Sequence, residues 1–167
     1  MINGAGGGVG TIAVQLAKAY GARVTGVDST EKMEMVRSLG ADHVIDYTQE
    51  DFAQSGQLFD LILDNVGSRS FSDCRRALTP HGIVLPNSGD AGTGYIVKAF
   101  VLSLFLRQQG SMFLAIPKHE DLVALKELIE SGKITSVIDR TYPLSETPEA
   151  FRYLDKGHAR GKVVITM

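Results

Sequence analysis

The chain has 167 residues, of which 44% are hydrophobic and 22% charged, and its formal net charge at pH 7 is −2. These values fit a soluble globular protein of one ordinary domain, or of one domain and part of another. They exclude a broadly basic surface for nucleic acid or anionic membranes, and the most apolar stretch, residues 95–106, is too short to span a bilayer.

The first feature along the chain is a glycine-rich stretch at residues 3–10, in which five of eight residues are glycine. Only the end of a strand, at residues 1–3, comes before it. The residues that follow predict a helix, because apolar side chains recur on one helical face at Val9, Ala13, Leu16, Ala17 and Tyr20. A glycine-rich turn before a helix presents unpaired backbone N–H groups to an anion and leaves room for it. We therefore expect a phosphate-binding turn here.

Strands and helices alternate through the middle of the chain. Short β-rich or apolar runs predict strands at residues 23–28, 43–47, 59–64, 82–86 and 112–116. Helices are expected at four places: after Ser29, around Phe52, from the Ser70–Asp73 capping box to Pro80, and from Tyr95 to Arg107. This alternation predicts βαβ units, and therefore an α/β fold with a parallel, doubly wound sheet flanked by helices.

The character of the sequence changes beyond Pro117. An amphipathic pattern predicts a helix at residues 120–131, and Thr147-Pro148-Glu149 is a strong start for another. Residues 137–142 and 161–166 are expected to be extended. No internal repeat joins this part to the first.

Two phosphate-binding motifs compete for the glycine-rich stretch. A nucleoside-triphosphate P-loop needs Lys directly after its last glycine, whereas Thr11 follows Gly10 here. The dinucleotide fingerprint fits better, with its three small residues at Ala5, Gly7 and Gly10. Its second half, an acidic residue at the end of the second strand, is Asp28, 18 residues after Gly10. The sequence thus predicts a nicotinamide-dinucleotide site rather than a plain structural turn.

Several separated motifs resemble those of one family. They are Ala-x-Gly-Gly-Val-Gly followed by Thr-Ile-Ala-Val-Gln-Leu-Ala-Lys, Ser-Leu-Gly-Ala-Asp-His-Val-Ile-Asp-Tyr (38–47), Phe-Asp-Leu-Ile-Leu-Asp-Asn-Val-Gly (59–67) and Gly-His-Ala-Arg-Gly-Lys-Val-Val-Ile (157–165). Over essentially the whole chain, they resemble the medium-chain dehydrogenase/reductase superfamily. The likeness is greatest to its zinc-independent quinone oxidoreductase branch, which includes proteins named NAD(P)-dependent alcohol dehydrogenase.

The resemblance implies a dinucleotide-binding Rossmann domain at residues 1–116. Residues 117–167 would return to complete a GroES-like catalytic domain, which in this family precedes the first Rossmann strand. We therefore expect the chain to hold the cofactor domain and a C-terminal segment left from a truncated catalytic domain. Residues 95–106 and this segment would then expose apolar surface, which makes self-association into a homo-oligomer a hypothesis.

Carried over residue by residue, the resemblance implies three groups of cofactor contacts. The pyrophosphate would lie against Gly7, Gly8, Val9 and Gly10. The adenosine ribose would be surrounded by Asp28, Ser29, Thr30, Lys32 and Tyr47. The nicotinamide half would lie along Asn65, Val66, Asn87, Ser88 and Gly89. No catalytic residue is assigned within the chain.

The cofactor preference depends on two opposing signals. A carboxylate such as Asp28 accepts hydrogen bonds from the ribose hydroxyls of NAD and repels the 2′-phosphate of NADP. Ser29, Lys32 and Tyr47, in contrast, are the kinds of residue that hold this phosphate in NADPH-using relatives. We expect the cofactor to be NAD or NADP, with a slight preference for NAD because of Asp28.

The remaining reactive residue types receive structural interpretations. The only cysteine, Cys74, excludes an internal disulfide, favours a reducing, cytoplasmic location, and lies on an apolar helix face typical of a core residue. The four histidines lack ligand spacing, so no metal site is expected. Asp60 and Asp64 flank a strand without an evident acid–base partner, which favours structural roles.

The function predicted is that of an NAD(P)-binding domain of an oxidoreductase. The whole enzyme would transfer hydride between the nicotinamide cofactor and a small carbonyl, quinone or enone substrate. The chain alone is expected to be inactive. One alternative is a non-catalytic dinucleotide-binding module or an inactive fragment that self-associates, and another is an interaction protein that binds no nucleotide.

Overall fold

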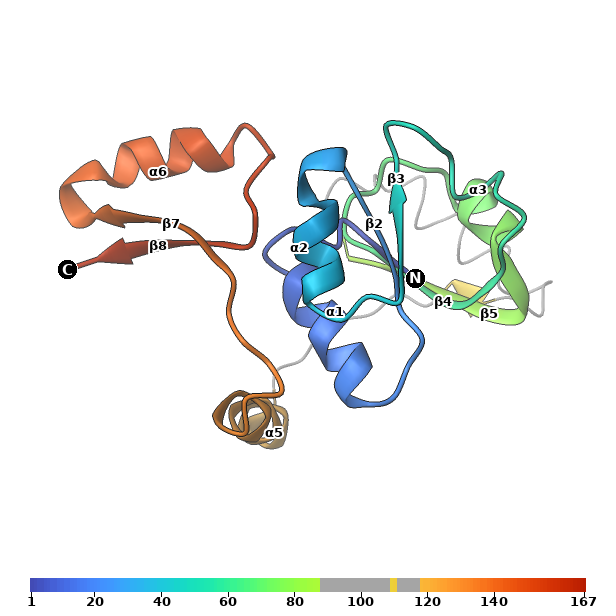
Figure 1. Ribbon diagram of the computed structural model, residues 1–167, viewed down its shortest axis with the longest axis horizontal. Coiled ribbons are helices and arrows are strands. Elements are labelled where there is room, and N and C mark those ends of the chain that lie inside the picture. Colours follow the sequence, from blue (N-terminus) through green and yellow to red (C-terminus); the bar gives the residue numbers. More distant parts are fainter. Residues whose placement is uncertain (88–108, 111–117) are drawn as a thin grey trace.

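The computed structural model describes residues 1–87, 109–110 and 118–167, and a six-stranded sheet runs through the first two of these segments (Figure 1). The strands lie in the order β3-β2-β1-β4-β5-β6, and all neighbours are parallel. Their bounds are β1 Ile2–Asn3, β2 Thr25–Asp28, β3 His43–Asp46, β4 Phe59–Asp64, β5 Leu78–Pro86 and β6 Gln109–Gly110. This is the strand order of the Rossmann fold, so the predicted parallel, doubly wound sheet is confirmed.

Helices follow β1, β2 and β4 in the chain. They are α1 Gly10–Ala19, the 3-10 turn η1 Thr30–Lys32, α2 Met33–Ser38 and α3 Phe71–Arg76. The predicted capping box opens α3: the Ser70 hydroxyl accepts from the Asp73 N–H, and the Asp73 carboxylate accepts from the Ser70 N–H. Met1 and Ile2 belong to two different clusters of buried side chains, since neighbouring residues of a strand point to opposite faces. The sheet is therefore packed on both faces.

The glycine-rich loop and α2 approach the sheet closely at Gly26. A Cβ added there would lie 2.5 Å from Cγ1 of Val36 and 3.0 Å from Cβ of Ala5. Only a residue without a side chain permits this approach. It brings the loop to the carboxyl ends of β1, β2 and β4, where the strand order reverses and where α/β sheets bind ligands.

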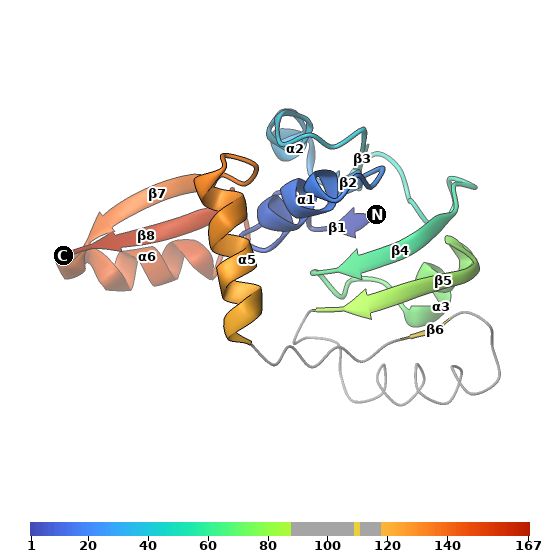
Figure 2. The ribbon, with the colours of Figure 1, turned by 90° about the horizontal axis from the view of Figure 1, so that it is seen from below.

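The C-terminal part forms a second, smaller unit beside the first (Figures 1 and 2). Its elements are α5 His119–Glu130, β7 Ile138–Pro143, the 3-10 turn η2 Leu144–Glu146, α6 Thr147–Leu154 and β8 Lys162–Thr166. β7 and β8 pair in parallel as a separate sheet. Gln15 of α1 joins the two parts: its amide donates to the Thr135 carbonyl at 2.9 Å and accepts from the Thr135 N–H at 2.8 Å. No described helix has the length and apolarity needed to span a membrane.

Three predicted elements differ from the structure. Residues around Phe52 form turns rather than a small helix, because the Asp51 carboxylate accepts from the N–H of Ala53 in an Asx turn, which offers the backbone an alternative to helical hydrogen bonds. α3 ends at Arg76 rather than at Pro80, because β5 begins at Leu78, not at residue 82, and includes Pro80. The register with β4 shifts between Phe59 and Leu61, so that Pro80 lies in an irregularity where the ladder needs no N–H from it.

Three predicted features lie outside the described residues: the helix from Tyr95 to Arg107, the strand at 112–116, and the positions Ser88 and Gly89.

Candidate functional site

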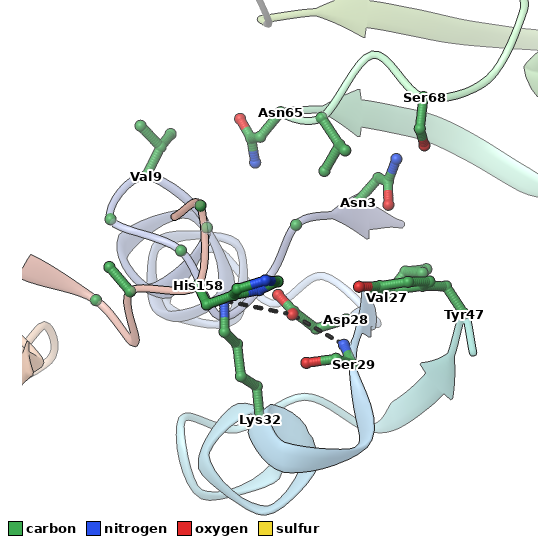
Figure 3. A pocket seen from close by; sticks show the side chains of 18 of the residues that line it. Asn3, Val9, Val27, Asp28, Ser29, Lys32, Tyr47, Asn65, Ser68 and His158 are labelled. Atoms are coloured by element: carbon green, nitrogen blue, oxygen red, sulfur yellow. Dashed lines mark hydrogen bonds and ion pairs between the residues drawn. The ribbon is translucent and has the colours of Figure 1, made fainter. Parts of the chain in front are cut away.

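A cavity of about 920 Å³ lies at the carboxyl ends of the central strands (Figure 3). Three of its walls come from the Rossmann part: the glycine-rich loop, the end of β2, and the end of β4. The fourth wall comes from the C-terminal part, mainly from residues 158–162, which we call the strap. The cavity thus joins residues from both ends of the chain.

The glycine-rich loop turns tightly into α1. The N–H of Gly7 donates to the carbonyl of Gly4 at 3.3 Å, and the N–H of Thr11 donates to the carbonyl of Gly7 at 3.0 Å. Within the described residues no hydrogen bond uses the N–H groups of Gly8, Val9 or Gly10 as donors. These three residues and Gly7 line the cavity. A row of unpaired amides at the start of a helix is suited to hold a phosphate.

Asp28 ends β2 with its carboxylate almost fully buried beside the loop. One carboxylate oxygen accepts from the N–H of Gly6 at 2.7 Å, and the other accepts from the N–H of Ser29 at 2.9 Å. The ammonium of Lys32 lies 3.6 Å from Asp28, and the Lys32 stem packs where a Cβ of Gly6 would stand (Figure 3). The carboxylate therefore ties the loop to β2, and a cation lies next to it in the cavity wall.

Of the residues predicted around the adenosine ribose, four line the cavity and one does not. Asp28, Ser29, Lys32 and Tyr47 are in the wall. The hydroxyl of Thr30 instead donates to the carboxylate of Asp46, which holds it away from the cavity.

The end of β4 supplies the wall opposite Lys32 (Figure 3). Asn65 and Val66 line the cavity as predicted. Asn87 is not in the wall, but its amide donates to Oδ1 of Asn65 at 2.9 Å. This bond leaves the buried Nδ2 of Asn65 without a partner among the described residues. Asp64 accepts at one oxygen from the N–H groups of Val66 and Gly67, so its structural role in shaping this turn is confirmed.

Sequence reasoning missed the strap. His158, Ala159, Gly161 and Lys162 line the cavity, and the N–H of Gly161 donates to the carbonyl of Gly6 at 3.0 Å. A Cβ on Gly8 would lie 3.3 Å from Nζ of Lys162, so this ammonium stands over the unpaired amides. In the sequence, residues 157–165 are distinguished only by a motif that resembles the family. Nothing local in them shows that they return to the first ten residues.

Cys74 is a core residue, as predicted, with 0% of its surface exposed. Burial, with a smaller contribution from the charges of Asp64 and Asp73, raises the pKa of its thiol to about 12. Because the thiolate is the reactive form, we expect the folded protein not to react with a chromogenic disulfide reagent at pH 8. The same reagent should titrate the thiol fully in guanidinium chloride. Rapid labelling while the circular dichroism remains native would contradict this assignment.

Comparison with known proteins agrees with this geometry. Residues 39–165 match the family described as zinc-binding dehydrogenase. The chain is 41% identical to the mouse NAD(P)H oxidoreductase RTN4IP1, mitochondrial, and the alignment covers 100% of the chain and 47% of that protein. It is 38% identical to the NADPH-dependent alkenal/one oxidoreductase, chloroplastic, of Arabidopsis thaliana, over 99% of the chain and 39% of the relative.

A solved structure shows the same fold. The quinone oxidoreductase from Coxiella burnetii superposes with a TM-score of 0.83 at 30% identity, over 99% of the chain and 51% of that protein. The chain therefore spans about half the length of the relatives that it matches.

The description of the matching family names zinc, which proteins bind through clustered Cys, His, Asp or Glu side chains. Among the described residues no group of three or more His, Cys, Asp and Glu side chains is placed to hold a metal ion. The described part of the chain does not fit such a site.

Proposed function

Because the chain belongs to the zinc-binding dehydrogenase family of the medium-chain dehydrogenase/reductase superfamily, a family of oxidoreductases, we propose that it forms the NAD(P)H-binding part of such an enzyme. One observation carries this proposal: unpaired loop amides, a buried carboxylate at the end of β2 and the ammonium of Lys162 surround a single cavity. Dinucleotides present a pyrophosphate and a ribose diol at this spacing in Rossmann proteins.

The described residues divide the proposed site into three parts. The amides of Gly8, Val9 and Gly10, with the ammonium of Lys162, would hold the pyrophosphate. Ser29, Lys32 and Tyr47, beside the carboxylate of Asp28, would surround the adenosine ribose. The Nδ2 of Asn65, buried and without a partner among the described residues, is a hydrogen-bond donor for the nicotinamide half.

The chemistry proposed for the whole enzyme is hydride transfer, which the nicotinamide ring supplies when bound. The substrate class we propose is a carbonyl, quinone or enone, supported by the names of the relatives, a quinone oxidoreductase and an alkenal/one oxidoreductase. The role of the chain's own residues is to bind the dinucleotide and orient it.

We further propose the division into a cofactor domain, residues 1–116, and a C-terminal segment, residues 117–167. Three large apolar side chains of the second unit support it, since each is more than half exposed: Ile138, Leu144 and Phe151. Apolar side chains that gather on one surface mark a place where another protein surface packs. We propose that these side chains pack against another domain of a longer protein or, if the chain self-associates, against a second copy.

Binding of the cofactor tests the proposal directly. The 167-residue chain is titrated with NADH and with NADPH, and both the nicotinamide fluorescence and the thermal unfolding midpoint are recorded. A saturable fluorescence change with a rise of the midpoint is expected for at least one of them, because a ligand that binds only the folded state stabilises it. No change of either quantity with either dinucleotide would contradict the proposed function.

The preference between the two dinucleotides is proposed to favour NAD(H) slightly, and to depend on the pair Asp28 and Lys32. Lys32→Met keeps the apolar stem that packs on Gly6 and removes the ammonium. We expect it to weaken NADPH binding about tenfold, the value of one charge-assisted hydrogen bond to a phosphate, with NADH affinity nearly unchanged. Asp28→Asn is the matched variant and should shift the ratio toward NADPH. Equal losses for both dinucleotides in Lys32→Met would contradict this role of the ammonium.

A further inference from the structure

Asp139, which does not line the cavity, binds the backbone of the strap. Asp139, on β7, accepts at one carboxylate oxygen from the hydroxyl of Tyr153 at 2.5 Å and from the backbone N–H of Arg160 at 2.9 Å. Arg160 lies within the strap, directly before the two residues that cover the glycine-rich loop. Asp139 therefore bonds the backbone of the strap on the side away from the cavity.

The backbone on the other side of Arg160 has little freedom. Gly161 has φ +94°, and a Cβ there would collide with the carbonyl oxygen of Val137 and lie 2.9 Å from the Val137 Cβ. The N–H of Lys162 donates to the same Val137 carbonyl at 2.8 Å. Since Val137 directly precedes β7 and Asp139 is the second residue of β7, the start of this strand sets the direction of the strap backbone.

Charged groups around Asp139 favour the ionised carboxylate. Burial alone would raise the pKa of Asp139, but hydrogen bonds from Tyr153 and Arg160 and the charges of Arg140 and Arg160 hold it below its ordinary value. The hydrogen bond to Asp139 raises the pKa of Tyr153. At neutral pH the phenol is therefore the donor and the carboxylate the acceptor. The guanidinium of Arg140 lies over the Tyr153 ring, 4.1 Å from its centre.

We propose that Asp139 is a positioning residue for dinucleotide binding, because it fixes Arg160 and thereby places Gly161 against Gly6 and the Lys162 ammonium above Gly8. The inference rests on the proposed function. Without the carboxylate, the Arg160 N–H and the Tyr153 hydroxyl lose this acceptor. Among the hydrogen bonds and ion pairs of the described residues, the bonds of Gly161 and Lys162 and the exposed ion pair of Arg160 with Glu31 then hold the strap. Exposed ion pairs of this kind contribute little.

The test is a double-mutant cycle on the 167-residue chain, with dissociation constants for NADPH and NADH from fluorescence titration. The variants are Asp139→Ala, Lys162→Ala and the two combined. Asp139→Ala is expected to weaken dinucleotide binding about tenfold, because the free energy of about one hydrogen bond that orders the strap is lost. Once Lys162 is alanine, Asp139→Ala should add less than about twofold, because both changes act on the same contact. A purely structural role would give additive losses.

Two further variants separate positioning from folding. Tyr153→Phe removes one donor to Asp139. It should weaken dinucleotide binding less than Asp139→Ala does and leave the unfolding midpoint native. If Asp139→Ala does not fold, the affinity of Tyr153→Phe tests the positioning role instead. Arg152→Ala breaks an exposed ion pair with Glu149 on the same unit and should leave affinity unchanged.

Unchanged affinity in both Asp139→Ala and Tyr153→Phe, or additive losses in the cycle, would overturn the inference. Failure of the unsubstituted chain to bind either dinucleotide would instead overturn the proposed function.

Discussion

Replacing Gly10 with Ala is expected to abolish dinucleotide binding and to lower the free energy of unfolding by about 3 kcal/mol or more, at the upper end of what overpacking costs. The added Cβ would collide with the carbonyl oxygen of Gly4 and stand 2.7 Å from the Cα of Ala5. Both neighbours are backbone atoms, so relief requires the loop to move away from α1. Urea unfolding and NADPH titration of the same preparation measure the two effects.

Gly7→Ala is the matched control, three residues earlier in the same loop. Its Cβ would meet only the Gly4 carbonyl oxygen, at 3.5 Å, which is ordinary van der Waals contact. Its stability should therefore stay within about 1 kcal/mol of the unsubstituted chain. Native stability and native affinity in Gly10→Ala would show that the tight turn is not what shapes the site.

Lys162→Ala should weaken the binding of NADH and NADPH equally, by about 10- to 100-fold, since one or two charge-assisted hydrogen bonds to the pyrophosphate are lost. The side chain is exposed, so the unfolding midpoint should change little. Isothermal titration at two salt concentrations measures the effect. The dependence of affinity on salt should be smaller in the variant, because screening no longer acts on this ammonium.

Lys156→Ala provides the comparison for Lys162→Ala. Lys156 is an exposed lysine of the C-terminal part that does not line the cavity, and its loss removes the same charge from the chain. Equal losses of affinity in the two variants would mean that only the net charge matters. A loss confined to NADPH would assign Lys162 to the 2′-phosphate and not to the pyrophosphate.

Much of the Rossmann part could be predicted, because its signals are local. β4 has the predicted bounds. The glycine-rich loop and Asp28, which the dinucleotide fingerprint places within one βαβ unit, lie side by side in the structure. One error also has a local cause. A helix is expected around Phe52, yet Asp51 accepts from the Ala53 N–H in a turn instead. Thr30 does not line the cavity as Ser29 does, because its hydroxyl donates to Asp46 of the neighbouring strand.

The strap could not be predicted from its own residues. The sequence around Gly161 and Lys162 predicts only the start of a strand. Their place in the cavity wall depends on contacts with Gly6 and Gly8. No periodicity or spacing reports a contact between positions so far apart in the chain. The same holds for Gln15, whose amide bonds Thr135 across 120 positions. Residues that act through tertiary contacts leave no pattern in the segment that holds them.

The contact between Gly6 and Gly161 also has a consequence for the order of folding. The loop amides and Asp28 come together through connections of short range, whereas the fourth wall requires the last residues of the chain to meet the first ones. Closing so long a loop has a large entropic cost and is slow compared with local pairing. We therefore expect the chain to acquire its sheet before its binding competence, so that ligand affinity is the last property to appear during refolding.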